Sequence, residues 1–232
     1  MNLLAIDTAA SVFSAALGTD RGVWHFETDS GMRHSELLLD TVDMLMKKSG
    51  LVPSDLDGVL CMRGPGSFTG LRIGFAAAKG LALSLGLPFS AFSTLECGAH
   101  AFSVWPGLVV PVIDARKNAF FYALYSGGQR LCPDTEAAAP EIARSINAAV
   151  SGPRENRVLL TGPGAETLYR ELPGPSPFIT VNPEFRRGNA LFLLEIAKNV
   201  DILNNSYVNA GPEYIRKSDA ELNLRTSKNF GF

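Results

Sequence analysis

The chain has 232 residues, of which 46% are hydrophobic and 19% are charged, and its formal net charge at pH 7 is −2. This composition excludes an intrinsically disordered chain, which would be poor in apolar residues and rich in net charge, and it suffices for one large or two modest folded domains. The basic residues include isolated pairs such as Lys47–Lys48, so we expect no basic surface able to hold nucleic acid unaided.

Cysteine usage and the N-terminal sequence indicate a cytoplasmic protein. The three cysteines lie far apart and form no C-x-x-C pair: Cys61, Cys97 and Cys132. Such cysteines are typical of small buried hydrophobic residues in a reducing compartment. The N-terminal MNLLAIDT has no basic region before its apolar run, and the longest stretch without a formal charge is too short and too broken to span a bilayer. We therefore expect no membrane contact.

The first half of the sequence alternates short apolar runs with helical patterns. Apolar residues recur at helical spacing within 33–48, and Gly50 and Pro53 end that pattern. The predicted elements are, in chain order, strands over 2–7, 11–18 and 21–27, a helix over 33–48, a strand over 59–62, a helix over 70–85, a strand over 89–92 and a helix over 94–102. Strands followed by alternating helices and strands predict an α/β domain.

The second half begins with a similar hairpin. AIDTAASVFSAALG at 5–18 aligns without a gap with VIDARKNAFFYALY at 112–125, at an offset of 107. The elements predicted after it are a helix near 139–150, a strand over 157–161, a helix over 164–171, a strand over 177–181 and a helix over 189–203. Four matched positions alone are too few to exclude chance, but with the repeated element order they predict a duplicated domain.

The duplicated α/β pattern resembles the actin-like, ribonuclease-H-like fold (ASKHA type) of sugar kinases, Hsp70 and actin. In that fold two α/β halves face each other across a cleft. We expect an N-terminal domain over 1–105 and a C-terminal domain over 106–232, with the hinge at Ser103–Gly107. The last segment is expected to pack back on the first domain.

A nucleotide site of this fold would use Asp7, at the end of the first strand, together with two glycine-rich loops. The glycines of those loops are Gly64, Gly66, Gly162 and Gly164. Loop N–H groups can hold phosphate, and a carboxylate can orient Mg²⁺. However, Thr8 and Ala9 follow Asp7 where the D-x-G turn of the fold has glycine, and no Walker A motif is present. Asp7 can equally cap its own turn and the glycines can serve tight turns, so weak ATP or ADP binding stays open and no cofactor is expected.

Metal-dependent and serine-hydrolase chemistry have little support in the sequence. The histidines His25, His34 and His100 fall on different predicted elements, without H-x-x-x-H or H-E-x-x-H spacing. The segment GSFTG at 66–70 is not the G-x-S-x-G of a nucleophile elbow. We assign no catalytic residue and no metal ligand.

The predicted helix GLRIGFAAAKGLALSLG carries small residues at helical spacing. Gly70, Gly74 and Ala78 form one such row, and Ala76, Gly80 and Ser84 form another. Glycine inside a helix costs about 0.5–1 kcal/mol relative to alanine, so a close neighbour is expected to compensate. That neighbour is either an element of the same domain or a partner helix, with Arg72, Phe75 and Lys79 at the margins.

Four segments across residues 1–125 resemble the TsaB (YeaZ) family: MNLLAIDTAASVFSAALG, RHSELLLDTVDML, RGPGSFTGLRIGFAAAKGLA and PVIDARKNAFFYALY. Near the end, PEYIR at 212–216 resembles the closing P-x-Y-L-R of the family, with Ile215 in place of Leu. Residues 126–210 resemble the family mainly in layout.

This resemblance implies a role in the bacterial tRNA threonylcarbamoyladenosine modification pathway. The related catalytic subunit TsaD transfers a threonylcarbamoyl group to the adenosine beside the tRNA anticodon. TsaD carries a two-histidine metal motif on the helix corresponding to 33–48, whereas this chain has His34 and, at the partner spacing, Leu38. The resemblance therefore implies a non-catalytic dimerisation subunit, without activity alone, that pairs with TsaD. A small ATPase, TsaE, joins the assembly, and tRNA is reached only through the complex.

The family pairs N-terminal domains through their helices, which implies a partner surface on 33–48 and 70–85. The candidate interface residues are Arg33, His34, Glu36, Leu37, Gly70, Arg72, Gly74, Phe75, Ala78 and Lys79. Glu36 or Asp43 either pairs with a basic residue of the partner or is simply a solvated charge. In isolation the same face could support a homodimer. The alternative function is an actin-like ATPase or phosphotransferase that uses Asp7 and the glycine-rich loops; metallopeptidase activity, once attached to relatives of this fold, lacks ligands here.

Overall fold

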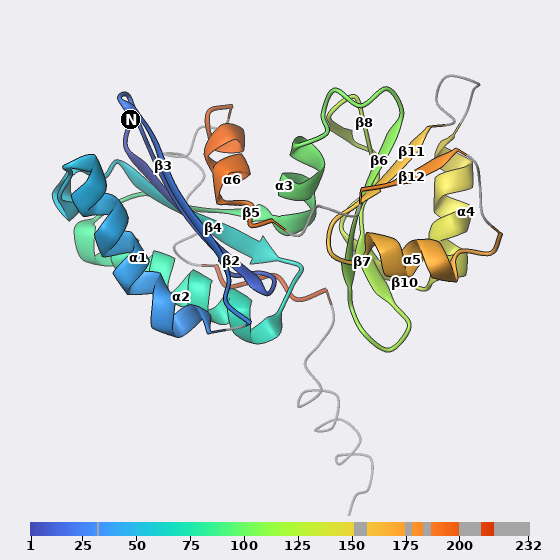
Figure 1. Ribbon diagram of the computed structural model, residues 1–232, viewed down its shortest axis with the longest axis horizontal. Coiled ribbons are helices and arrows are strands. Elements are labelled where there is room, and N and C mark those ends of the chain that lie inside the picture. Colours follow the sequence, from blue (N-terminus) through green and yellow to red (C-terminus); the bar gives the residue numbers. More distant parts are fainter. Residues whose placement is uncertain (32, 151–156, 175–177, 183–186, 200–209, 216–232) are drawn as a thin grey trace, which may run out of the picture.

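The computed structural model describes residues 1–31, 33–150, 157–174, 178–182, 187–199 and 210–215. It contains two β-sheets that lie side by side along the long axis of the molecule (Figure 1). Each sheet combines an antiparallel hairpin with parallel strands contributed by later segments. The chain therefore has the actin-like α/β fold (ASKHA type) that the sequence predicts.

The first sheet has the strand order β3-β2-β1-β4-β5. Strand β1 pairs antiparallel with β2 and parallel with β4, as expected for a hairpin followed by a helical crossover. Its strands are β1 (Leu3–Asp7), β2 (Val12–Thr19), β3 (Gly22–Asp29), β4 (Gly58–Gly64) and β5 (Phe89–Ser93). Strands β1 and β5 are buried throughout, whereas the edge strand β3 alternates between exposed and half-buried residues.

Helices cover both faces of the first sheet. Helices α1 (His34–Ser49) and α2 (Phe68–Leu85) pack on one face, where Leu4 and Ile6 of β1 point. Helix α6 (Ala190–Ala197) packs on the other face, against Leu3 and Ala5. Consecutive side chains of a strand point to opposite faces, so one short apolar strand supplies both cores.

The second sheet has the order β10-β7-β6-β11-β12, with β8 paired to β6 and β9 paired to β8. Its strands are β6 (Leu108–Asp114), β7 (Phe120–Tyr122), β8 (Tyr125–Ser126), β9 (Gln129–Arg130), β10 (Thr135–Ala137), β11 (Val158–Thr161) and β12 (Ile179–Val181). Helices α4 (Ala139–Ala149) and α5 (Ala165–Glu171) cover one face, and α3 (Thr94–His100) contacts β6 from the first half. A 3₁₀ turn at Pro53–Asp55 follows α1.

The second hairpin is shorter than the sequence predicts. Arg116, Lys117 and Asn118 all have positive φ, between 56° and 59°, so the chain turns tightly before β7. The pairs β8–β9 and β7–β10 were not expected from the sequence. The helix predicted over 94–102 ends at His100, and the one predicted over 189–203 is α6, with 200–203 outside the described residues.

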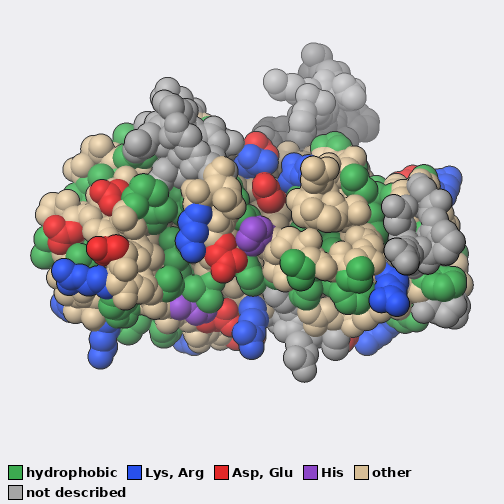
Figure 2. Space-filling model, turned by 90° about the horizontal axis from the view of Figure 1, so that it is seen from above, with side chains coloured by type: hydrophobic (Ala, Val, Ile, Leu, Met, Phe, Trp, Pro, Cys, Tyr) green, Lys and Arg blue, Asp and Glu red, His purple; other side chains and the backbone are tan. Residues whose placement is uncertain are grey.

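The chain passes from the first sheet to the second between α3 and β6, near residue 105. Helix α6 comes after the second sheet in sequence yet packs against β1, β2 and α3. None of the helices in the described ranges combines the length and the apolar composition of a membrane-spanning segment. On the face drawn in Figure 2, basic and acidic side chains are interspersed, and no large field of one sign covers that face.

Candidate functional site

The loop between β4 and α2 packs against the turn that joins β1 to β2. The Ser67 backbone N–H donates to the Ala9 carbonyl oxygen at 2.7 Å, and the Ser67 hydroxyl caps α2 by accepting from the Gly70 N–H. A Cβ at Gly66 would lie 2.5 Å from the same Ala9 oxygen. The position where loop N–H groups were expected to hold phosphate is therefore in contact with the chain's own backbone.

The glycines of α2 have two different environments. A Cβ at Gly70 would overlap the Thr8 carbonyl oxygen, and one at Gly74 would overlap the Thr8 hydroxyl, which itself donates to the Gly70 carbonyl at 2.8 Å. A Cβ at Gly80 would meet nothing within 4 Å. Of the two alternatives that the sequence left open, Gly70 and Gly74 therefore serve packing within the domain.

Five of the predicted interface residues are buried inside the chain, which corrects their assignment to a surface. They are His34, Gly70, Gly74, Phe75 and Ala78. The Phe75 ring packs edge-on against Phe89 of β5, with the ring centroids 5.0 Å apart, and Ala78 is fully buried in the same core. The four of these residues that belong to α2 lie on the side of the helix that faces the sheet, because α2 packs on β1 and β4.

His34 is a core residue at the start of α1. Its Nε2 donates to the Ala10 carbonyl at 2.8 Å, which leaves Nδ1 of the neutral ring to accept from the Ser30 hydroxyl at 2.9 Å. Burial lowers the pKa of His34, against the opposing effects of the Ala10 hydrogen bond and the nearby Asp7 carboxylate. The hydrogen bond from His34 to Ala10 therefore connects the start of α1 to the β1–β2 turn.

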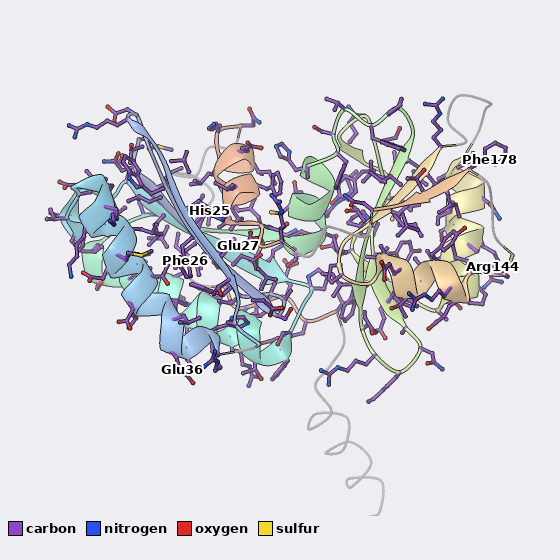
Figure 3. All side chains as sticks on the ribbon, viewed as in Figure 1. His25, Phe26, Glu27, Glu36, Arg144 and Phe178 are labelled. Carbon is purple, nitrogen blue, oxygen red and sulfur yellow. The ribbon has the colours of Figure 1, made fainter. Side chains whose placement is uncertain are left out.

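The sides of α1 and α2 that face away from the sheet form one surface, which we call the outer face. It comprises Arg33, which directly precedes α1, then Glu36, Leu39, Asp40 and Asp43 of α1, and Arg72, Ala76, Gly80, Leu83 and Ser84 of α2. Leu39 is 69% exposed and Leu83 is 56% exposed. Figure 3 shows Glu36 on the side of α1 turned away from the sheet, while Leu37 is only partly buried at the rim of the core.

Sequence reasoning identified Arg33, Glu36 and Arg72 of this outer face but missed Leu39 and Leu83. Both leucines lie off the buried stripes of their helices, which is a signal that the sequence does carry. Lys79, another of the predicted interface residues, is half-buried at the margin of the outer face.

Residues 210–215 lie across α2 and the preceding loop, and we call them the strap. The Glu213 N–H donates to the Arg63 carbonyl at 2.8 Å, and the Glu213 carboxylate lies 3.0 Å from the Arg63 guanidinium. Arg72 stacks on Phe68, with its Cζ 3.9 Å from the ring centroid, and donates to the Tyr214 hydroxyl at 3.0 Å. The strap therefore fixes one basic residue of the outer face in a defined position.

Lys79 is also held by the strap, since its Nζ donates to the Ala210 carbonyl at 3.1 Å. Gly64 has a φ of 117°, and a Cβ atom added there would lie 2.8 Å from the Glu213 carbonyl oxygen. The described part of the PEYIR motif is thus engaged with the β4–α2 loop; Arg216 lies outside the described residues.

Asp7, the last residue of β1, is buried. Its carboxylate accepts from the Ala9 N–H at 2.8 Å, from the Asn189 N–H at 2.8 Å and from the Asn189 side-chain amide at 3.1 Å. Burial raises the pKa of Asp7, and these hydrogen bonds oppose the rise. The carboxylate caps its own turn and ties it to the segment before α6, so a Mg²⁺ ion would have to displace these bonds.

The loop at 162–164 also packs against the chain itself. Gly162 has φ of 92°, and a Cβ there would lie 2.6 Å from the Val112 carbonyl oxygen. The Gly164 N–H donates to that oxygen at 3.0 Å. Beside this loop a cleft of about 200 Å³ lies between the two halves. In the described part of the chain, no group of three or more His, Cys, Asp or Glu side chains could hold a metal ion.

Comparison with known proteins places these features in a family. The family model described as "TsaD: tRNA N6-adenosine threonylcarbamoyltransferase" matches residues 28–182. Two proteins named tRNA threonylcarbamoyladenosine biosynthesis protein TsaB are 37% identical over 126 residues (Bacillus subtilis) and 40% identical over 128 residues (Escherichia coli). Each alignment covers 54% of this chain and 55% of the relative, so the chain matches about half the length of these relatives.

Longer matches agree with this placement. An uncharacterized protein of Mycobacterium tuberculosis is 30% identical over 168 residues, which is 71% of this chain and 78% of that protein. A Pseudomonas aeruginosa crystal structure, described as an uncharacterized protein similar to peptidase YEAZ, superposes with a TM-score of 0.77 at 23% identity, over 93% of this chain and 99% of that one. A structure described as YeaZ from the same organism superposes with a TM-score of 0.68 at 24% identity, over 92% and 99%. These two likenesses support the fold.

Proposed function

The chain belongs to the TsaB (YeaZ) family, and from this premise we propose that it acts in tRNA threonylcarbamoyladenosine biosynthesis as a non-catalytic subunit. In this role it pairs with a TsaD-type catalytic subunit through the outer face of α1 and α2. The printed names of the curated TsaB relatives support the pathway. The geometry of the outer face supports the mode of action.

The observation that carries the proposal is the exposed apolar and small-residue surface on two adjacent helices. Leu39 and Leu83 are each more than half exposed, and the Cβ position of Gly80 opens into empty space. Ala76, Gly80 and Ser84 form a shallow row at i, i+4 and i+8 on which the backbone of another helix can approach closely. Exposed leucines beside such a row are typical of a surface that a partner covers.

The charges of the outer face indicate the character of the partner. Glu36, Asp40 and Asp43 are exposed on α1, and Asp43 is paired with Lys47 on the same helix. We therefore expect basic side chains on the partner opposite Glu36 and Asp40. Such rim pairs orient the two proteins and speed association more than they strengthen binding.

Two features of the chain support a non-catalytic role. Both ring nitrogens of His34 are engaged within the fold, and Leu38, at the second position of the two-histidine spacing, is 2% exposed in the core. Asp7, the residue on which the ATPase alternative depends, accepts three hydrogen bonds from the chain itself. A TsaE-type ATPase and tRNA would then act through the complex, and the outer face would support a homodimer only when the partner is absent.

The test is reconstitution of the modification reaction with purified TsaD-type and TsaE-type proteins, the enzyme that supplies the carbamoyl-adenylate, and tRNA. We expect modification to depend on this chain and to fall strongly with Leu39→Glu and with Leu83→Glu. Leu131→Glu is the matched control, because Leu131 is 51% exposed on the second half, after β9. Modification that proceeds equally well without the chain would refute the proposal.

A further inference from the structure

The strap holds Arg72 at one end of the small-residue row of the outer face. Arg72, Ala76 and Gly80 are spaced at i, i+4 and i+8 on α2, and all three are exposed. We propose that Tyr214 of the strap positions Arg72 to bind an acidic side chain of the partner subunit. This inference rests on the proposed function, because it names the chemistry that the same surface recognises in its partner.

Tyr214 is held in place by contacts that do not involve Arg72. The preceding residue, Glu213, donates its backbone N–H to the Arg63 carbonyl oxygen at 2.8 Å. The Tyr214 ring itself packs on Phe68 of α2, with the ring centroids 4.7 Å apart. Since the tyrosine has these supports of its own, it can fix the position of the arginine.

The Arg72 guanidinium is ordered, yet it keeps hydrogen-bond donors for a partner. Its Nε donates to the Tyr214 hydroxyl at 3.0 Å, and its Cζ lies 3.9 Å from the centroid of the Phe68 ring. Arginine carries further N–H donors on its terminal nitrogens. Within the part of the chain that the structure describes, those of Arg72 have no hydrogen bond and no ion pair with an acidic side chain. The exposed side chain thus presents these donors to a partner from a fixed position.

An arginine that is already ordered gains more from a specific contact than a mobile one. A mobile arginine has to give up rotamer freedom when it binds, whereas a side chain held by Tyr214 and Phe68 gives up less. Arginine and tyrosine are also among the residues that most often carry the binding energy of protein interfaces. We therefore expect Arg72 to contribute more to affinity than an unsupported charge such as Glu36.

The charges of the outer face favour a carboxylate of a protein over a phosphate of a nucleic acid. Glu36, Asp40 and Asp43 are exposed on α1, and the formal net charge of the chain is −2. Such a surface repels a phosphate backbone. A partner protein with an acidic side chain opposite Arg72 and basic side chains opposite α1 complements both signs. The two parallel hydrogen bonds that a guanidinium forms with a carboxylate would also fix the position of the partner helix along the row.

The test is a double-mutant cycle on the binding of the full chain to a TsaD-type protein, measured by surface plasmon resonance. Arg72→Gln is expected to weaken binding about tenfold, through loss of a charge-assisted hydrogen-bonded pair. Tyr214→Phe keeps the ring and removes the hydroxyl, and it is expected to weaken binding about threefold, because Arg72 loses a support. If Tyr214 acts through Arg72, the double variant binds no more weakly than Arg72→Gln alone. Arg72→Glu should weaken binding further than Arg72→Gln, because it sets two carboxylates against each other.

Arg144→Gln is the matched control, because Arg144 lies on α4 at the far side of the second half, away from the outer face (Figure 3). It should leave the affinity unchanged. Tyr214 is 38% exposed, and Tyr214→Phe removes only the acceptor of one exposed hydrogen bond. The melting temperature of the isolated variant should therefore equal that of wild type, so weakened binding cannot be ascribed to unfolding.

The inference alone is overturned if wild type binds and Leu39→Glu weakens binding, while either Arg72→Gln or Tyr214→Phe binds as wild type. It is also overturned if the losses of the two variants add in the double variant, or if Arg72→Glu binds more tightly than Arg72→Gln. A further contrary result is that Arg72→Gln weakens only the binding of the assembled complex to tRNA, which would assign the arginine to nucleic acid. Failure of the wild-type chain to bind the TsaD-type protein would refute the proposed function and this inference together.

Discussion

The glycines of α2 allow the packing argument to be tested with one substitution at two positions of the same helix. At Gly70 an added methyl group would overlap the Thr8 carbonyl oxygen, which belongs to the backbone of the β1–β2 turn and cannot rotate away. At Gly80 the same methyl group would meet nothing within 4 Å. Gly70→Ala and Gly80→Ala are therefore expected to change stability in opposite directions.

The expected magnitudes follow from these surroundings. Overpacking at Gly70 costs about 1–3 kcal/mol, and loss of the 2.8 Å bond from the Thr8 hydroxyl to the Gly70 carbonyl adds about 1 kcal/mol. Gly70→Ala should thus destabilise the fold by about 2–4 kcal/mol, which lowers Tm by about 4–16 °C in a chain of this length. Gly80→Ala should stabilise it by about 0.5–1 kcal/mol through helix propensity, raising Tm by about 1–4 °C.

The assay is thermal and urea denaturation followed by far-UV circular dichroism, with both variants measured beside wild type. If the glycines of this row instead served a partner helix, Gly70→Ala would keep the stability of the isolated chain and weaken only the complex. Equal effects of the two substitutions on stability, or no effect of Gly70→Ala, would refute the packing argument.

Three further changes follow from the buried contacts. Asp7→Asn should destabilise the fold by about 1–3 kcal/mol in urea denaturation, because three N–H donors lose a charged acceptor; undiminished stability would contradict the capping role. The lowered pKa of His34 means that the unfolded chain binds a proton more readily, so stability should fall as pH drops from about 6.5 through the lowered folded-state value. His34→Asn should make stability depend less on pH in this range, and an unchanged pH profile of stability would contradict this role of His34. Gly98→Ala, whose Cβ would meet only Pro111 at 3.6 Å, should raise stability by about 0.5–1 kcal/mol while narrowing the cleft, and a lower Tm would show that α3 is packed more tightly than the structure indicates.

The sequence predicted most of the fold because the governing patterns are local. The apolar runs of β1, β4 and β6 predicted strands, and the glycines after α1 and α2 do end those helices, with Gly50 and Gly86 in the left-handed conformation. The two similar hairpins predicted the duplication. The very short strands β8, β9 and β10 carry no such pattern, since two or three residues are too few for a period to be recognised.

The site was less predictable because its contacts join distant segments. Gly70, Gly74 and Gly80 look alike in the sequence, and only the position of Thr8 separates the first two from the third. The sequence indicated Phe75 and His34 as interface residues, whereas in the structure Phe75 packs against Phe89 and His34 donates to the Ala10 carbonyl oxygen. The strap contacts α2 across 131 and 142 residues of sequence, and no periodic pattern could have indicated it.

Light scattering after size exclusion, on a mixture of this chain with a TsaD-type protein, tests the central claim most directly. Our account predicts a single peak with the mass of a one-to-one complex, and two separate peaks when Leu39→Glu replaces wild type. Separate elution of the wild-type chain and the TsaD-type protein, each with its own mass, would contradict pairing through the outer face.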